Sequence, residues 1–137
     1  MDAERARAFL LTLPHVAETL QWGDNLVFWV GDKSIGGKMF AVLNLAADAH
    51  GVISFASTPE RFAELVEQEG LKPAPYLARA HWVAADNWTC LRPAVWEAEL
   101  RDANAVIFAR LPKRTRDTLL STPAKKSQKP LKKRRAL

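Results

Sequence analysis

Cysteine is almost missing from this chain of 137 residues, since Cys90 is its single copy. One cysteine cannot close a disulfide within the chain, and it excludes a zinc site built from several thiolates. The histidines are few and scattered: His15, His50 and His81 form no HxH or HExxH spacing. We therefore expect no metal site and no cofactor. The low cysteine content favours a reducing, cytoplasmic location.

Long apolar runs are also absent. No stretch approaches the roughly 20 apolar residues that a membrane-spanning helix needs. The first residues, MDAERARAFLLTLP, carry charges at Asp2, Glu4, Arg5 and Arg7 and hold only a short apolar segment. That pattern is not typical of a signal peptide. We expect a protein that has no membrane partner.

Aromatic side chains, by contrast, are plentiful. The chain is 48% hydrophobic and contains five Trp and six Phe, which indicates a globular protein rather than a disordered one. A chain of this length suits one domain, and it can bury roughly two-thirds of its unfolded surface. The composition therefore predicts a hydrophobic core that is stable without a disulfide.

Charge is divided unevenly along the chain. Residues 1–112 hold 10 Lys and Arg against 14 Asp and Glu, a net charge of −4. Residues 113–137 hold 10 Lys and Arg against one acid, Asp117, a net charge of +9. From Ser121 onward the sequence STPAKKSQKPLKKRRAL is too polar to offset the entropy of ordering it. We therefore predict a folded domain over 1–120 and a disordered basic C-terminal tail over 121–137.

Three helices are predicted. The first spans Ala3–Leu13 with Asp2 as its cap, and the second begins at Pro59 and ends at Gly70. The last long helix begins at Pro93, and its apolar residues recur at spacings of 4, 3 and 4: Trp96, Leu100, Ala103 and Ile107. Each helix has a single apolar stripe, so we expect all three to pack on the same side of a sheet.

Short apolar runs separated by turn residues predict the strands of that sheet. They are Thr19–Trp22, Leu26–Val30, Lys38–Leu45, Val52–Ala56 and His81–Ala85, with a resumption around Thr89–Leu91. Short turns between successive strands imply antiparallel pairing. The predicted fold class is α+β, an antiparallel β-sheet with helices on one face, in the order α-β-β-β-β-α-β-α. Residues 72–77 are expected to form a rigid connection.

Few residues suggest catalysis. Cys90 lies beside Trp88 and Leu91, which favours a buried structural thiol over a nucleophile. Most carboxylates fall on the polar faces of the predicted helices. The tryptophans are mainly expected in the core. Trp29 is the exception. It follows Phe28 in a strand, so one of the two must point away from the core, and we expect Trp29 to lie on an open sheet face or in a shallow pocket.

Several segments together resemble the MmcQ/YjbR family. They are LPHVAETLQW at 13–22, LVFWVGDKSIGGKMFAV at 26–42 and TPERFAELVEQEGLKPAPYLARAHWV at 58–83, and the likeness extends to Leu111-Pro112-Lys113. It covers about residues 1–113. The resemblance implies a compact α+β fold of the CyaY/frataxin-like kind, with helices on one side of an antiparallel sheet. Family members are often labelled DNA-binding through similarity to a "double wing" fold, and the family has no agreed catalytic residues.

Two functions remain open, and neither is enzymatic. The first is weak, non-sequence-specific binding of DNA or RNA, since lysine and arginine bind phosphates through charge density. Its expected contacts are Lys113, Arg114, Arg116, Lys125, Lys126, Lys129, Lys132, Lys133, Arg134 and Arg135, with domain contacts at Lys38, Lys72, Arg79, Arg92 and Trp29. The second is a small-ligand or protein-binding module that uses the open sheet face, with a merely solubilising tail. A basic stripe favours the first, and a neutral or acidic, aromatic-lined concavity favours the second. No oligomeric state is predicted.

Overall fold

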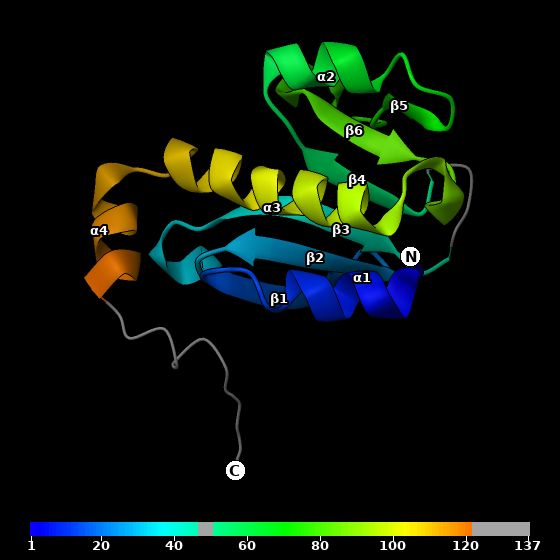
Figure 1. The fold of residues 1–137 in the computed structure, drawn as a ribbon. Coiled ribbons are helices and arrows are strands. Elements are labelled where there is room, and N and C mark those ends of the chain that lie inside the picture. The colour runs from blue at the N-terminus through cyan, green and yellow to red at the C-terminus, as the bar shows by residue number, and fades with distance from the viewer. Residues whose placement is uncertain (47–50, 122–137) are drawn as a thin grey trace.

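A six-stranded antiparallel sheet forms the centre of the computed structural model, which describes residues 1–46 and 51–121 (Figure 1). The sheet order is β1-β2-β3-β4-β6-β5. The strands are β1 (Val16–Gln21), β2 (Asn25–Val30), β3 (Lys38–Asn44), β4 (Ile53–Ala56), β5 (Leu71–Pro73) and β6 (Trp82–Ala85). The α-helices are α1 (Ala3–Leu10), α2 (Pro59–Leu65), α3 (Pro93–Arg110) and α4 (Lys113–Ser121). Three short 3-10 helices are η1 (Lys33–Ile35), η2 (Ala78–Ala80) and η3 (Trp88–Cys90).

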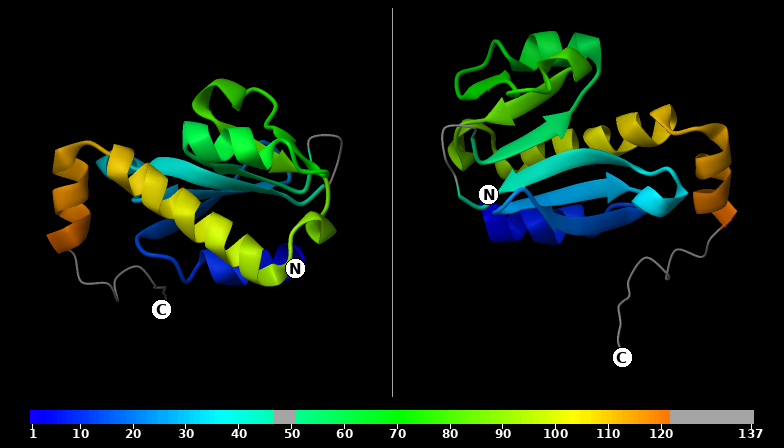
Figure 2. Two further views of the ribbon diagram at one scale, coloured as in Figure 1. Left: turned by 45° about the horizontal axis from the view of Figure 1, so that its top comes forward. Right: turned by 180° about the vertical axis from the view of Figure 1, so that it is seen from behind.

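Helices cover one face of the sheet, as the sequence predicts. Seen from behind, the right-hand view of Figure 2 shows β2 and β3 with α3 beyond them and none of the drawn helices in front. The apolar stripe of α3 is confirmed, because Trp96, Leu100 and Ala103 are fully buried. The Trp96 ring meets Phe55 of β4 edge-to-face, with ring centroids 6.3 Å apart. One face is therefore core and the other is left open.

Two ion pairs join helices to neighbouring elements. Arg7 of α1 binds both carboxylate oxygens of Glu18 in β1, with Nε–Oε2 at 2.6 Å and Nη2–Oε1 at 2.9 Å. Arg61 of α2 donates to Glu99 of α3, with Nε–Oε2 at 3.0 Å. Glu99 is buried, which departs from the expectation of a solvated carboxylate. The pair joins α2 to α3 and compensates the buried charge.

Several predicted boundaries are wrong. The first strand starts at Val16 rather than Thr19 and ends before Trp22, which takes a positive φ of 50°. Helix α1 ends at Leu10, since Thr12 and Leu13 bond back three residues in tight turns. His81 precedes its strand instead of opening it, with a φ of 64°.

The second half of the chain holds more elements than predicted. Helix α2 stops at Leu65, well before Gly70, and the residues after Gly70 form strand β5 along β6. The expected strand around Thr89–Leu91 is instead η3, because the Asn87 side chain accepts the Thr89 N–H at 3.0 Å and caps a helical turn. The observed order is α-β-β-β-β-α-β-β-α-α, leaving out the 3-10 helices.

A fourth helix, α4, follows the one predicted to be last. Pro112 ends α3, and the chain turns into α4 at the end of the sheet (Figure 1). Thr115 donates its hydroxyl proton to the Ile35 carbonyl at 2.9 Å, and Leu119 is buried. Helix α4 ends at Ser121, the first residue of the predicted tail, and the remainder of that tail lies outside the described residues. None of the helices in the described part of the chain combines the length and the apolar character that a bilayer crossing needs.

Candidate functional site

The open face of the sheet begins with the alternation in β2. Phe28 points into the core and is fully buried, whereas Trp29 points the opposite way and is half-buried. The indole Nε1 of Trp29 donates to the Thr19 hydroxyl at 2.9 Å, which fixes the ring across β1. The Lys33 ammonium lies 5.8 Å from the centre of the same ring. Trp29 therefore occupies the open face, where the sequence places it.

A β-bulge decides which β3 residues share that face. Phe28 pairs with Ala41 and Trp29 pairs with Met39, so Phe40 is an extra residue in the ladder. Without the bulge Phe40 would stand opposite Trp29 on the open face. With it, Phe40 is fully buried in the core. Met39 is left beside Trp29 on the open face.

A groove of about 400 Å³ runs over this surface. We call it the sheet-face groove. It is lined by Trp22, Asn25, Met39, Val42, Ser54, Pro75, Tyr76 and Leu77. Its floor comes from β2, β3 and β4, and its walls come from the β1–β2 turn and from the segment between β5 and η2. The volume falls within the range of small-molecule sites, which is about 300–1,000 Å³.

Two aromatic side chains of the groove stand out in solvent. Trp22 is 64% exposed and Tyr76 is 96% exposed. Both have positive φ, 50° and 67°, a region that bulky residues seldom adopt. The Asn25 side-chain amide donates to the Trp22 carbonyl at 3.1 Å and holds that turn. The sheet-face groove thus presents two aromatic rings from segments far apart in the sequence.

The groove is electrically neutral at its surface. None of its lining residues is Asp, Glu, Lys or Arg. Its polar side-chain atoms are the Asn25 amide, the Ser54 and Tyr76 hydroxyls and the Trp22 indole N–H. The amide and the hydroxyls can each donate and accept a hydrogen bond, and the indole can only donate. The site can accept a flat, uncharged group with a hydrogen-bonding edge, held mainly by stacking and apolar contact.

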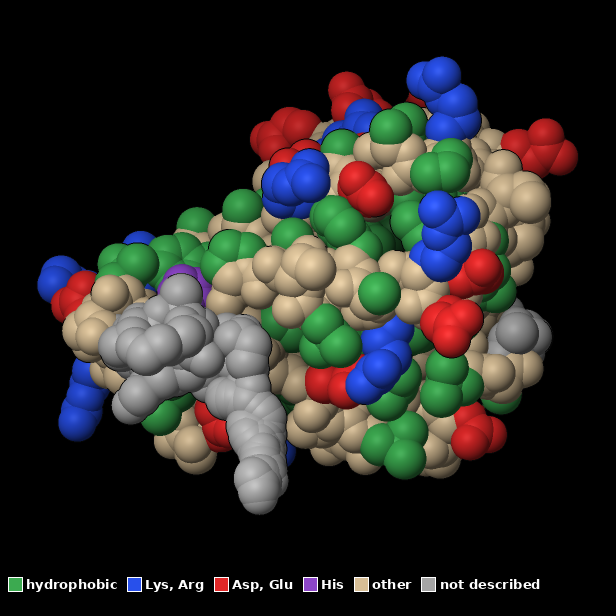
Figure 3. Space-filling model, turned by 60° about the horizontal axis from the view of Figure 1, so that its bottom comes forward, with side chains coloured by type: hydrophobic (Ala, Val, Ile, Leu, Met, Phe, Trp, Pro, Cys, Tyr) green, Lys and Arg blue, Asp and Glu red, His purple; other side chains and the backbone are tan. Residues whose placement is uncertain are grey.

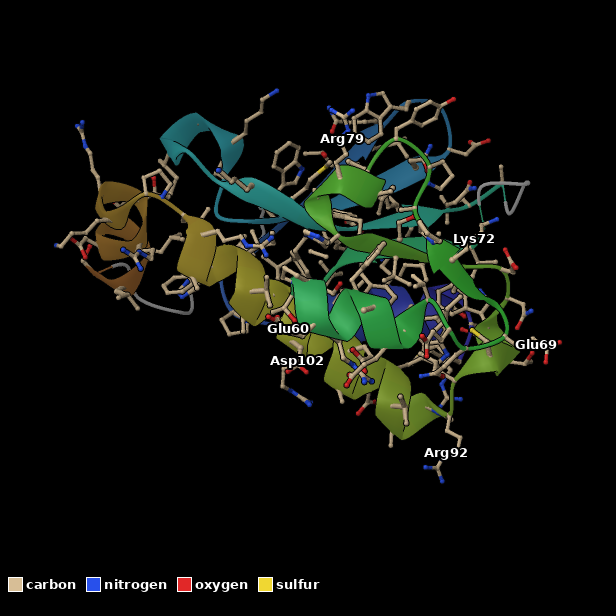
Figure 4. The ribbon with its side chains drawn as sticks, turned by 90° about the horizontal axis from the view of Figure 1, so that it is seen from above. Glu60, Glu69, Lys72, Arg79, Arg92 and Asp102 are labelled. Atoms are coloured by element: carbon tan, nitrogen blue, oxygen red, sulfur yellow. The ribbon has the colours of Figure 1, made fainter. Side chains whose placement is uncertain are left out.

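The cations predicted as domain contacts do not gather in one place. In Figure 4, Arg79 and Arg92 lie on opposite sides of the molecule, and Lys72 lies at a third position. Lys72 forms an ion pair with Asp86 at 2.9 Å. Lys38 begins β3, beside the η1 turn. On the face shown in Figure 3, acidic and basic side chains are interspersed, and the blue ones do not merge into a stripe.

The predicted C-terminal cations are only partly described. Lys113 binds Asp117 one turn later along α4, at 2.8 Å. Arg114 is exposed, and Arg116 is half-buried with its Nε enclosed and without a hydrogen-bond partner among the described residues. The other seven cations, Lys125, Lys126, Lys129, Lys132, Lys133, Arg134 and Arg135, lie outside the described residues.

The residues weighed for catalysis or metal binding lie apart from the groove. Burial raises the pKa of the Cys90 thiol, which keeps it protonated, and its Sγ lies 3.2 Å from the Asn87 carbonyl. His15 stacks on Phe108, with ring centroids 5.6 Å apart, and burial lowers its pKa. His81 meets the edge of Phe62, and His50 is outside the described residues. Within residues 1–46 and 51–121, no three His, Cys, Asp or Glu side chains lie close enough to hold a metal ion.

Sequence reasoning missed Trp22 and Tyr76 as site residues. It placed Trp22 at the end of a strand and Tyr76 in a rigid connection. The signal for Trp22 was the sequence Trp-Gly-Asp-Asn. Gly, Asp and Asn favour a turn, and a turn between two strands leaves the Trp22 side chain exposed. No comparable signal marks Tyr76, because its exposure depends on how the segment between β5 and η2 lies against the sheet.

Comparisons with known proteins point to one family. A family model described as YjbR matches residues 11–105. The crystal structure of the Deinococcus radiodurans protein DR2400, described with a DUF419 domain, aligns with a TM-score of 0.74 and 25% sequence identity. That alignment covers 90% of this chain and 90% of the other. No curated protein matches the sequence.

Proposed function

Since this chain belongs to the YjbR family, we propose that it is a non-catalytic binding protein that takes a flat, uncharged group into the sheet-face groove. The observation that carries the proposal is the pair Trp22 and Tyr76, both exposed, at the edges of an uncharged apolar groove. Exposed aromatic rings beside a concave apolar surface are typical of ligand and partner sites. An aromatic-lined neutral concavity is also the feature that favours a ligand-binding module over a nucleic-acid-binding domain.

The strained backbone supports the same proposal. A left-handed conformation costs a non-glycine residue about 1–2 kcal/mol. Burial of the two rings does not offset this conformational cost, since both remain largely in solvent. Backbone strain of this kind is often retained at a functional site.

A fluorescent probe tests the groove directly. N-phenyl-1-naphthylamine is flat, uncharged and brighter in apolar surroundings. We expect saturable binding of one probe per chain, weakened in W22A and in Y76A. L120A is the matched control, because Leu120 is as exposed as Trp22, at 67%, but lies on α4. Equal binding by all four proteins would refute the proposal.

A second candidate, binding of DNA or RNA through the C-terminal cations, is favoured by the charge division. Residues 125–135 contain seven Lys and Arg within eleven residues. Such a density attracts a polyanion without a folded interface. The test is a gel-shift titration of the full chain and of a chain that ends at Ser121, which retains every described element. The shorter chain has a net charge of −2, because seven cations are removed from +5, and it should lose affinity.

A further inference from the structure

Two polar side chains lie on opposite sides of the floor of the sheet-face groove. Ser54 of β4 pairs with Val42 of β3, and Val42 pairs with Val27 of β2. Asn25 precedes Val27 by two residues, so it shares the open face with Val42 and Ser54. Two strand spacings and two residues along β2 separate the Cα atoms of Asn25 and Ser54 by about 12 Å. The ladder of the sheet fixes this separation.

The floor between these two side chains is apolar. Val42 occupies β3 between Asn25 in β2 and Ser54 in β4, and Met39 lines the same groove. Neither Val42 nor Met39 offers a strong hydrogen-bond partner. A ligand that fills the groove should therefore be apolar in its middle and polar at its two ends.

Both polar side chains can bind an uncharged oxygen. Asn25 Nδ2 donates one hydrogen bond to the Trp22 carbonyl at 3.1 Å, and the second N–H and the oxygen of this amide lie outside that bond. The Ser54 hydroxyl can donate or accept. A carboxylate or an ammonium group would find no opposite charge in the lining. Hydrogen bonds of about 2.8 Å at each end leave roughly 6–9 Å between the two oxygens of the ligand, the span of two rings rather than one.

We propose that the sheet-face groove binds an uncharged aromatic compound of two joined or fused rings with a hydroxyl or carbonyl oxygen at each end. This inference rests on the proposed function of the groove and names its ligand class. Trp22 and Tyr76 reach the groove from opposite edges of the sheet, the first from the β1–β2 turn and the second from the segment after β5. Their rings contact the faces or edges of the ligand, and Asn25 and Ser54 select its length.

Three phenols that differ in length and in number of hydroxyls test this spacing. 2,6-Dihydroxynaphthalene has a hydroxyl at each end of two rings, 2-naphthol lacks one of them, and hydroquinone carries both on one ring. All three are uncharged at pH 7. Isothermal titration calorimetry measures their binding, and displacement of N-phenyl-1-naphthylamine shows whether they share its site. We expect the diol to bind about 2- to 10-fold more tightly than 2-naphthol, as one additional hydrogen bond provides, and hydroquinone to bind most weakly.

A serine variant tests one end of the floor. S54A should abolish the advantage of the diol over 2-naphthol, because it removes the hydroxyl at that end, while changing naphthylamine binding less than about twofold. S34A is the matched control and should keep the full advantage, because Ser34 is an exposed serine of η1 outside the groove lining. A diol that binds no more tightly than 2-naphthol, or an advantage that persists in S54A, would overturn the inference.

The proposed function fails by a different result. If naphthylamine binds and is weakened in W22A and Y76A but the diol has no advantage, the groove remains a ligand site and the assigned ligand class is wrong. If neither naphthylamine nor any of the phenols binds, the proposed function and this inference are both wrong.

Discussion

Arg61 and Glu99 form an ion pair between α2 and α3 in which the Glu99 side chain is 6% exposed and the Arg61 side chain is 38% exposed. Glu64, one turn further along α2, also accepts from Arg61 at 2.9 Å. These carboxylates raise the pKa of Arg61 well above its usual value. The pair ties α2, which packs on β5 and β6, to α3.

R61M should destabilise the fold by about 1–3 kcal/mol, because it leaves the Glu99 carboxylate buried without its partner. The matched control is K113M, which breaks an exposed pair on α4 and should cost less than about 0.5 kcal/mol. Urea denaturation of both variants measures the difference. The double variant R61M/E99M should recover part of the loss, since it removes the stranded charge. Equal losses in the two single variants would contradict this account.

Alanine substitutions of the two tryptophans on opposite faces of the sheet should destabilise the fold by different amounts. W96A should destabilise by about 3–5 kcal/mol, as large-to-small core changes do, because Trp96 is fully buried and also bonds the Trp88 carbonyl at 2.9 Å. W29A should cost less, since Trp29 is half-buried on the open face. Urea unfolding at pH 7 compares them. A loss at Trp29 as large as that at Trp96 would mean that Trp29 belongs to the core.

The elements that sequence reasoning found are those whose signal is local. Trp96, Leu100 and Ala103 repeat at helical spacing after Pro93, so α3 could be predicted from the chain alone. The strand predicted at Lys38–Leu45 was found at Lys38–Asn44, because its apolar run Met39–Leu43 follows a turn region. Alternation in β2 predicted that Phe28 and Trp29 point to opposite faces, and the hypothesis placed Trp29 on the open one.

The elements that it missed depend on contacts with distant residues. Strand β5 has three residues and includes Pro73, and it exists only through its pairing with β6. Helix α4 is mostly polar, and it is anchored by Thr115 on the carbonyl of Ile35, 80 residues away in sequence. The bulge that buries Phe40 and the positive φ of Tyr76 likewise follow from the assembled sheet.

His15 makes stability depend on pH in a defined window. Burial lowers its pKa below 6.5, the usual value for histidine, so the unfolded chain binds the proton more readily. Stability is therefore full above about pH 6.5 and falls as the pH drops toward the folded pKa. H15N should flatten this slope while keeping the backbone, because asparagine tolerates the φ of 63°. Urea unfolding at pH 8, 6 and 5 measures it. An unchanged slope in H15N would assign the pH dependence to another group.

Salt should weaken the binding of DNA or RNA through the C-terminal cations. These cations act by releasing counterions from phosphates. If the seven cations of residues 125–135 neutralise about five phosphates, log K for duplex DNA should fall against log salt with a slope near −4 to −5.

In a chain ending at Ser121 the slope should approach zero together with the affinity, because the remaining chain is net acidic and repels the polyanion. W22A and Y76A should leave both the affinity and the slope unchanged, since no cation is lost. A titration of anisotropy against salt for these three variants measures the contribution of the C-terminal cations. An unchanged affinity and slope after truncation at Ser121 would move the phosphate contacts into the folded domain.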